Sequence, residues 1–580
     1  MTGPVRVLIV AASLGGSARH TPLGAARIVS ALKACPASAG KIEPELLAVT
    51  VPGDPARLAR TALDRRPRAV GFSLYVWNRD LLLAAARDLR RDRPDLVLFA
   101  GGPEATADPA GVRAEGGLDF VVEGEGEESA PLALERALAG ADPGEVPGVL
   151  GSGVPAPDGR DREPVVSARA PGVPARVFGA RAREPGVLAR AELSRVPSPY
   201  LDGTLNVSEY GGGLWELARG CPFACHFCYE SKGCRGVRSF PDEVVRAELR
   251  AFVRGGAREV FVLDPTFNAD PARARDILTL LRREAPGIHF TFEIRSEFLD
   301  AAQARLFGSI PCSVQVGLQS ARPEVLAVVG RPGFDRKEFR RRTAMLSAAG
   351  VVFGLDLIYG LPGDDLAGFR ESLDYALSLE PNHLDVFRLS VLPGTVLADR
   401  AGELGLEREP RPPYGVRSSP SFPAGDLAQA EGLARAADLF YSRGRAVGWF
   451  LPVLRPLRTR PSAFLQEISD RARERTGARE DLGHGEIEGF QLETLEAAYR
   501  AAGQEGFLPV VRDLVTLHGA WTRALAEGET TRLRLTRRPD DLFGPAARDP
   551  ARLARTVPER PGAWIVRPGP AGPRIEPAGK

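Results

Sequence analysis

The sequence predicts an α/β protein with three parts: an N-terminal doubly wound parallel sheet, a central partial (β/α)6 barrel and a mostly helical C-terminal domain. Strand-like and helix-like segments alternate over residues 1–150, and the alternation resumes from about residue 214. Beyond about residue 405 helical periodicity replaces it. We therefore expect domains at 1–150, 196–404 and 405–580, joined by a linker at 151–195 that is rich in Pro, Gly and Arg.

Five apolar segments predict the strands of the N-terminal sheet. Segments with helical spacing, such as 23–34 and 79–91, separate them, which is typical of a doubly wound sheet. Ligands of such sheets bind at the carboxyl ends of the strands. The loops at those ends are 13–22, 75–78, 101–106 and 124–127. The predicted strands are 5–13, 45–51, 69–77, 96–102 and 119–127.

Six further strand candidates, again separated by helical segments, predict the central barrel. Six parallel strands fit a partial barrel, whose chemistry is expected at the carboxyl ends of the strands. Residues 425–445 and 485–527 have helical spacing, and short strands are predicted near the C-terminus at 531–537 and 563–568. The barrel candidates are 214–218, 259–264, 290–295, 313–320, 352–360 and 384–392.

Composition excludes several classes of protein. The 580 residues contain 76 Lys or Arg and 74 Asp or Glu, so the net charge of +2 gives no overall electrostatic footprint for nucleic acid. No run of 18 apolar residues is present, which argues against a membrane span. The N-terminus lacks the charged region of a secretory signal, so we expect a cytoplasmic protein. Six cysteines are few for a chain of this length, so a disulfide framework is not implied.

Three cysteines form the motif Cys-x3-Cys-x2-Cys directly after a predicted strand: Cys221, Cys225 and Cys228. Thiolates are soft ligands that select zinc or iron–sulfur clusters. Because a four-iron cluster commonly takes four thiolates, three would leave one iron open for another ligand. The alternatives are three unrelated buried thiols or a structural zinc site closed by Cys234 or His226. Structural zinc usually uses two separated ligand pairs, and a second pair is missing from the sequence.

This motif, with Phe227 before its last cysteine, resembles the signature of the radical S-adenosylmethionine (SAM) family. Further segments resemble the family in the same order, and together they span roughly residues 200–400: VLDPTFN, FEIR, VGLQS, DLIYGLPGDD and LSVLPGT. The resemblance implies that the three cysteines hold a [4Fe–4S] cluster and that SAM chelates the open iron. One electron would then cleave SAM to a 5′-deoxyadenosyl radical, which implies an external donor such as flavodoxin or ferredoxin.

The resemblance also implies SAM contacts at the ends of the barrel strands. Asp264 would meet the SAM amino group, and Tyr229 would face the adenine. The ribose and the carboxylate would be held by Glu293, Arg295, Gln319 and Ser320. An arginine suits a carboxylate because its paired donors match the two oxygens. The alternative for each residue is ordinary structure at the end of a barrel, and for Asp264 it is a turn or cap.

The N-terminal segments AVGFSLYVWN, LFAGGPEAT and VVEGEGEES resemble cobalamin-binding domains. The first loop lacks both Gly-x-Gly-x-x-Gly and a P-loop lysine, so a dinucleotide or nucleotide site is not indicated. Small residues would let the backbone approach a large corrinoid. The resemblance implies cobalamin contacts at Ser73, Gly101, Gly102, Glu125 and Gly126. For the glycine pair the alternative is a plain tight turn.

The loop after the first strand departs from the corrinoid carriers that coordinate cobalt through Asp-x-His-x-x-Gly. His20 has Ala18 where that pattern has Asp and Leu23 where it has Gly, so a cobalt ligand is not expected there. Tyr75, Trp77, Asn78 and Arg79 follow the third strand. We expect Trp77, or as second choice Arg79, to cover the lower face of the corrin. The alternative places Trp77 in the core at the sheet end.

The domain order resembles one subgroup of cobalamin-dependent radical SAM enzymes. It implies a methyltransferase that moves a methyl group from SAM, via methylcobalamin, to a carbon of a small-molecule, amino-acid or peptide substrate. A non-methylating rearrangement, cyclisation or oxidation with the same cofactors is the first alternative. A non-enzymatic zinc or corrinoid-binding scaffold is the second.

Overall fold

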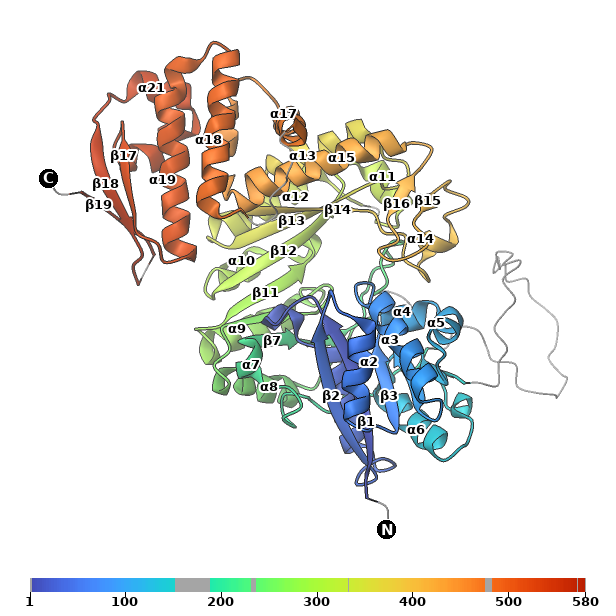
Figure 1. The fold of residues 1–580 in the computed structure, drawn as a ribbon. Helices are drawn as coiled ribbons and strands as arrows, with labels where there is room; N and C mark the ends of the chain where they lie inside the picture. The colour runs from blue at the N-terminus through green and yellow to red at the C-terminus, as the bar shows by residue number, and fades with distance from the viewer. Residues whose placement is uncertain are drawn as a thin grey trace.

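The computed structural model describes residues 3–151, 188–230, 236–331, 333–474, 482–570 and 572–578. Figure 1 shows the N-terminal domain beside the central sheet and the C-terminal helices at the far side of that sheet. Most of the predicted linker at 151–195 lies outside the described residues, and so does Cys234, the candidate fourth zinc ligand.

The N-terminal domain is a six-stranded sheet in the order β2-β1-β3-β4-β5-β6. Its first five strands are parallel, and the short β6 runs antiparallel to β5. The strands are β1 Val5–Ser13, β2 Ile42–Thr50, β3 Ala69–Ser73, β4 Val97–Gly101, β5 Phe120–Val122 and β6 Val149–Leu150.

Helices cover both faces of this sheet, so the predicted doubly wound fold is confirmed. One buried cluster packs the sheet against α2 (Pro55–Asp64), α3 (Arg79–Asp92) and α5 (Pro109–Gly116). The opposite face packs against α1 (Leu23–Ala34) and α6 (Gly126–Leu138). Because β1 lies between β2 and β3, the crossovers to its two neighbours leave on opposite faces. This point of reversal is where such sheets bind ligands, at the carboxyl ends of the strands.

The central domain is a sheet of six parallel strands that are neighbours in chain order, β7-β10-β11-β12-β13-β14. This confirms the predicted six-stranded parallel sheet. In β12 the residues alternate between buried and partly exposed, so one face packs under helices and the other lines the interior of the barrel. The strands are β7 Gly212–Trp215, β10 Glu259–Val262, β11 His289–Ile294, β12 Cys312–Gln319, β13 Val352–Tyr359 and β14 His383–Arg388.

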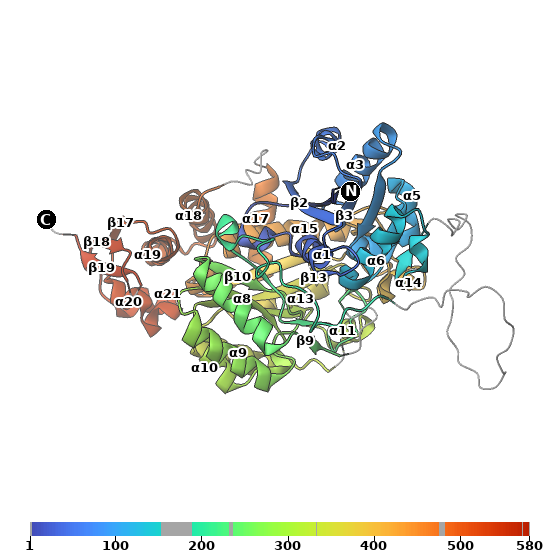
Figure 2. The same ribbon diagram turned by 90° about the horizontal axis from the view of Figure 1, so that it is seen from below.

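Helices lie along the outer face of this curved sheet, as Figure 2 shows for α8, α9 and α10. Their apolar residues form one continuous buried cluster with the strands. The helices are α8 Asp242–Arg254, α9 Pro271–Glu284, α10 Ala301–Phe307, α11 Pro323–Val328, α12 Arg336–Ala348 and α13 Leu366–Leu377.

The C-terminal region is mostly helical, as predicted. Helix α15 (Ala424–Ala437) continues into a π-helical turn, and α18 (His484–Ala501) and α19 (Leu508–Ala526) form a pair. The two predicted short strands are β17 (Thr531–Leu535) and β18 (Gly562–Arg567). They form an antiparallel sheet with a third strand, Arg574–Pro577, which the sequence did not predict.

Additional helices in this region include Phe450–Leu454, Pro461–Glu474, Pro539–Phe543 and Pro550–Thr556. The C-terminal helices share a buried cluster with the barrel strands, so the two parts have a common core. Among the described residues, every helix is too short or too polar to cross a membrane.

Candidate functional site

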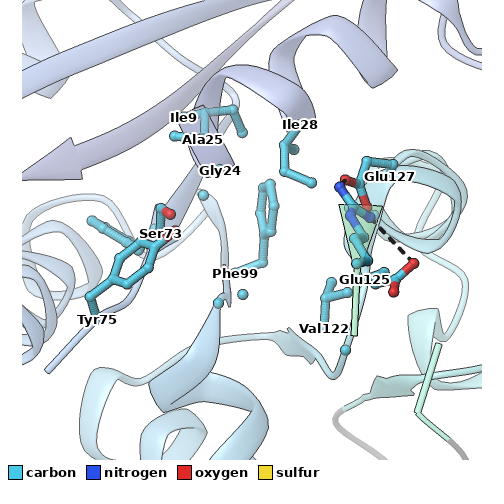
Figure 3. Close-up of a pocket in the computed structure, with 18 residues that line it drawn as sticks. Ile9, Gly24, Ala25, Ile28, Ser73, Tyr75, Phe99, Val122, Glu125 and Glu127 are labelled. Carbon is cyan, nitrogen blue, oxygen red and sulfur yellow. Dashed lines mark hydrogen bonds and ion pairs between the residues drawn. The ribbon is translucent and has the colours of Figure 1, made fainter. Parts of the chain in front are cut away.

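Two adjoining cavities lie at the carboxyl ends of β1 and β3. The first has a volume of about 210 Å³ and extends toward α6, and the second has a volume of about 490 Å³ and continues to the ends of β7 and β10. Figure 3 shows Ser73 and Tyr75 on one side of the first cavity and Glu125 and Glu127 on the other. Six of its lining residues are glycines: Gly24, Gly71, Gly101, Gly102, Gly124 and Gly126.

The glycine pair after β4 shapes one wall of this cavity. Gly102 has φ +102°, and a Cβ atom there would lie 2.7 Å from the carbonyl oxygen of Leu74. Only glycine fits this close backbone approach. A Cβ atom at Gly101 would meet nothing closer than Val122 at 3.8 Å, so the wall beside it is open. The glycines at this wall form a cradle in which a flat group of a ligand can lie against the backbone.

Tyr75 and Trp77 stack on each other at a ring distance of 4.5 Å. Both line the second cavity, and burial raises the pKa of the Tyr75 phenol. The Trp77 indole donates a hydrogen bond to the carbonyl of Ala12 at 3.1 Å, yet 45% of the residue stays exposed. Trp77 is therefore outside the core and presents its ring to the space between the two domains.

The next two residues have structural contacts. The Asn78 amide donates to the carbonyls of Ala12 and Ser73, and its oxygen accepts from the Tyr75 backbone, so Asn78 fixes the turn. Arg79 is buried and pairs with Glu104 at 3.4 Å and with another carboxylate, Glu115, at 3.0 Å. Arg79 lines neither cavity. This differs from the expectation that Arg79 is the second choice to cover the lower face of the corrin.

The cysteine loop follows the short strand β8 (Ala218–Arg219) and begins at Gly220, which has φ +91°. The Cys221 thiol lies 3.7 Å from the Thr266 hydroxyl. Burial raises the pKa of Cys225, and it raises that of Cys228 to about 12, with the neighbouring thiols adding to both shifts. Burial alone keeps these thiols protonated, whereas ligation to a metal deprotonates a thiol outright. They are therefore better suited to bind a metal than to act as free thiolates.

The three thiols do not close on a single ion. Among the described residues, no three Cys, His, Asp or Glu side chains form a group that could hold one metal ion. A structural zinc site needs each thiolate about 2.3 Å from one centre. A four-iron cluster instead binds each thiolate through a different iron, so the donors stand farther apart. In the sequence, the three close cysteines match three ligands of such a cluster and lack the second ligand pair that is usual for structural zinc.

Two guanidinium groups face this loop. Arg295 lies 3.7 Å above the Phe223 ring and pairs with Glu297 at 2.5 Å. Arg331 donates to the carbonyl of Gly317 at 3.0 Å and bonds the Gln319 side chain. Both arginines oppose the burial that raises the Cys225 pKa. Two guanidinium groups therefore lie close to Cys225.

The sequence reasoning missed Arg331. It lies in the turn after α11, outside every motif, and the bulge at Gln319 (φ +63°) brings the two side chains together. No local signal in the sequence points to this contact.

Other predicted SAM contacts differ in their surroundings. Glu293 lies on the interior face of the barrel, where burial raises its pKa to about 7 and the nearby Glu230 adds to the shift. Ser320 is fully buried against Ser372 and accepts from the backbone of Arg322. The Tyr229 hydroxyl interacts with Thr106 of the N-terminal domain. Because Ser320 is buried and bonded within the protein, it matches the alternative of ordinary structure at the end of a barrel strand.

Asp264 has the contacts of a cap. One carboxyl oxygen accepts from the backbone N–H groups of Leu217 and Ala218, at 2.8 and 3.0 Å, and burial raises the pKa of Asp264 to about 7.

Asp264→Ala should lower the free energy of unfolding by about 2–4 kcal/mol, because two buried donors lose their acceptor. Asp264→Asn keeps that oxygen and should recover most of the loss in urea unfolding. Equal losses in the two variants would contradict this role.

Comparison with known families accounts for this arrangement. Residues 9–134 match the B12 binding domain, and residues 215–376 match the radical SAM superfamily. The chain therefore contains a B12-binding domain followed by a radical SAM domain. These two domains imply a [4Fe–4S] cluster, SAM and cobalamin as cofactors.

Individual relatives support the same combination. The cobalamin-dependent radical SAM methyltransferase TokK of Streptomyces tokunonensis is 26% identical over 374 residues, which are 60% of this chain and 51% of TokK. The 2-(S-pantetheinyl)-carbapenam-3-carboxylate methyltransferase of Streptantibioticus cattleyicolor is 26% identical over 372 residues, with the same coverage of 60% and 51%. This chain thus spans about half the length of these curated relatives.

A solved structure shares the fold over most of the chain. The cobalamin-dependent SAM radical enzyme OxsB with aqua-cobalamin bound superposes with a TM-score of 0.56 and 14% identity, over 90% of this chain and 81% of OxsB.

Proposed function

We propose that the protein is a cobalamin-dependent radical SAM methyltransferase that acts on a carbon of a small-molecule, amino-acid or peptide substrate. The observation that carries the proposal is the continuous space from the glycine-lined cradle to the ends of β7 and β10. Arg219, two residues before the first loop cysteine, lines both of its cavities. TokK and the carbapenam-3-carboxylate enzyme are both methyltransferases, which supports the reaction class. Both domains would serve one substrate in the space between them.

The residues present fit the three cofactors. Cys221, Cys225 and Cys228 would hold the cluster, and Arg295 with Arg331 would hold the carboxylate of SAM by charge-assisted hydrogen bonds. The glycine cradle after β4 would hold the corrinoid, with Ser73, Glu125 and Gly126 also lining the first cavity. When bound, these cofactors supply one-electron reduction of SAM and a carrier for the methyl group. The chain itself positions them and excludes water.

The space left for the substrate has an apolar lining. Leu14, Trp77 and Leu263 line the second cavity and are 59%, 45% and 38% exposed, so their side chains are free to contact a ligand there. We infer a substrate with an apolar face, whose burial between the domains would keep water away from the reacting carbon. An external donor such as reduced flavodoxin or ferredoxin would supply the electron.

The products of SAM distinguish methyl transfer from other radical chemistry. The reconstituted, cobalamin-loaded protein should convert SAM to S-adenosylhomocysteine under anaerobic reducing conditions, measured by chromatography and mass spectrometry. Stoichiometric 5′-deoxyadenosine without S-adenosylhomocysteine would contradict methyl transfer and favour a rearrangement, cyclisation or oxidation.

A further inference from the structure

Arg219 lies at the centre of a buried ion-pair cluster between the two cofactor domains. Its guanidinium lies 3.3 Å from Glu125, 2.5 Å from Glu127 and 2.8 Å from Glu216. Only 12% of the Arg219 side chain and 7% of the Glu127 side chain are exposed. The dashed line in Figure 3 ends on Glu125, at the edge of the first cavity. A buried charge that loses its partner is costly, so each member of such a cluster depends on the others.

Two further arginines complete the cluster. Arg27 of α1 pairs with Glu216 at 3.1 Å. Arg238 of β9 (Arg238–Ser239) pairs with Glu125 and donates to the carbonyl of Ala191 at 2.9 Å. Three guanidinium groups thus face three carboxylates, and the charges of this set balance. The cluster joins α1 and α6 of the N-terminal domain to the β8–β9 pair that flanks the cysteine loop.

The cluster touches both cofactor sites. Arg219, Glu125 and Glu127 line the first cavity, and Arg219 lies two residues before Cys221. The other end of the loop is held as well, because Tyr229 interacts with Thr106, whose hydroxyl accepts from the backbone of Gly124 at 3.0 Å. The loop is therefore held at both ends by the domain that forms the cradle.

We propose that Arg219 is a positioning residue that couples occupation of the cradle to the position of the cysteine loop, so that corrinoid binding and cluster binding reinforce each other. A corrinoid in the first cavity displaces water from the ion pairs, and charges attract more strongly in a drier site. Tighter pairing fixes Arg219 and, with it, the start of the loop. By thermodynamic reciprocity, a cluster that fixes the loop must tighten corrinoid binding by the same factor.

The test measures binding of hydroxocobalamin to the full-length chain, without turnover. Equilibrium dialysis is carried out anaerobically on cluster-free and cluster-reconstituted protein. The wild-type chain should bind hydroxocobalamin about tenfold more tightly with the cluster present, which is within the usual range of allosteric coupling. In Arg219→Gln the ratio should fall to about one, and Arg219→Lys should restore part of it because it keeps the charge.

A second readout is the electron paramagnetic resonance spectrum of the reduced cluster. Because excess dithionite reduces the cluster and the bound corrinoid together, the cluster signal is compared between corrinoid-loaded and corrinoid-free protein. The two signals should differ in the wild type and coincide in Arg219→Gln. Glu127→Gln, which removes one carboxylate from the cluster, should also lower the binding ratio, and it decides the question if Arg219→Gln fails to fold. Arg523→Gln is the matched control, since it breaks a buried pair with Glu488 (2.6 Å) in the C-terminal region and should keep the tenfold ratio.

A wild-type ratio of one, or the same ratio in the wild type and both cluster variants, would overturn the proposal. The proposal goes beyond methyl transfer, because every measurement is one of binding or spectroscopy. Its failure would leave the proposed reaction intact, and failure of the reaction would leave the coupling intact.

Discussion

Cys225→Ala is expected to abolish the iron–sulfur cluster. Anaerobically reconstituted wild-type protein should contain about four iron and four sulfide per chain, and the variant less than about one of each. The reason is that SAM needs one open iron, so the three loop cysteines must supply every protein ligand. Elemental analysis and the visible absorption of iron–sulfide charge transfer measure the loss.

Cys312→Ala provides the matched control for this experiment. Cys312 is also buried, but it begins β12 and its thiol donates to the carbonyl of Phe307 at 3.3 Å, outside the loop. This variant should keep the full iron content. Retention of about four iron by Cys225→Ala, or an equal loss in Cys312→Ala, would contradict the assignment of the loop cysteines.

Gly101→Leu is expected to weaken cobalamin binding by about 100-fold, which corresponds to the upper part of the usual cost of overpacking, about 1–3 kcal/mol. Its new side chain has room at Cβ, because the nearest atom is 3.8 Å away, and it extends along the wall of the cradle. The fold should therefore tolerate the substitution, and the leucine side chain should occupy the space of the cradle. Titration with hydroxocobalamin, followed by absorbance, measures the change in affinity.

Gly287→Leu is the control, because a Cβ atom there meets nothing within 4 Å and the residue lies in an exposed turn before β11. It should bind hydroxocobalamin like the wild type. Unchanged affinity in Gly101→Leu, with its unfolding midpoint also unchanged, would show that the corrinoid does not use this cradle.

The strands of both parallel sheets were predictable because they are continuous apolar runs between helical segments. The predicted segment 5–13 coincides with β1, and the six barrel strands fall within a few residues of their predicted places. Among the strands that were not predicted, Arg574–Pro577 is four residues long and ends in proline, so it has no clear periodicity. Its strand conformation depends on pairing with β18, which is tertiary information.

The site was predictable where its residues share a short motif. The cysteine spacing and the Gly-Gly and Gly-Glu-Gly-Glu loops are local patterns, and the glycines of those loops do line the cavity. The arginines were not predictable in the same way. Arg331 meets Gln319 across a bulge, and Arg219 meets Glu127 across 92 residues of sequence. Arg79 follows a predicted loop, yet its guanidinium pairs with Glu104 and Glu115 and does not line the cavity.

Both cofactor domains are proposed to serve one methyl transfer. The most direct test uses SAM labelled with carbon-13 in its methyl group, together with the reconstituted, reduced protein and hydroxocobalamin, without any substrate. We expect the label to appear on the protein-bound corrinoid, detected by mass spectrometry, together with an equal amount of S-adenosylhomocysteine. An unlabelled corrinoid, with SAM either intact or converted only to 5′-deoxyadenosine, would contradict the central claim.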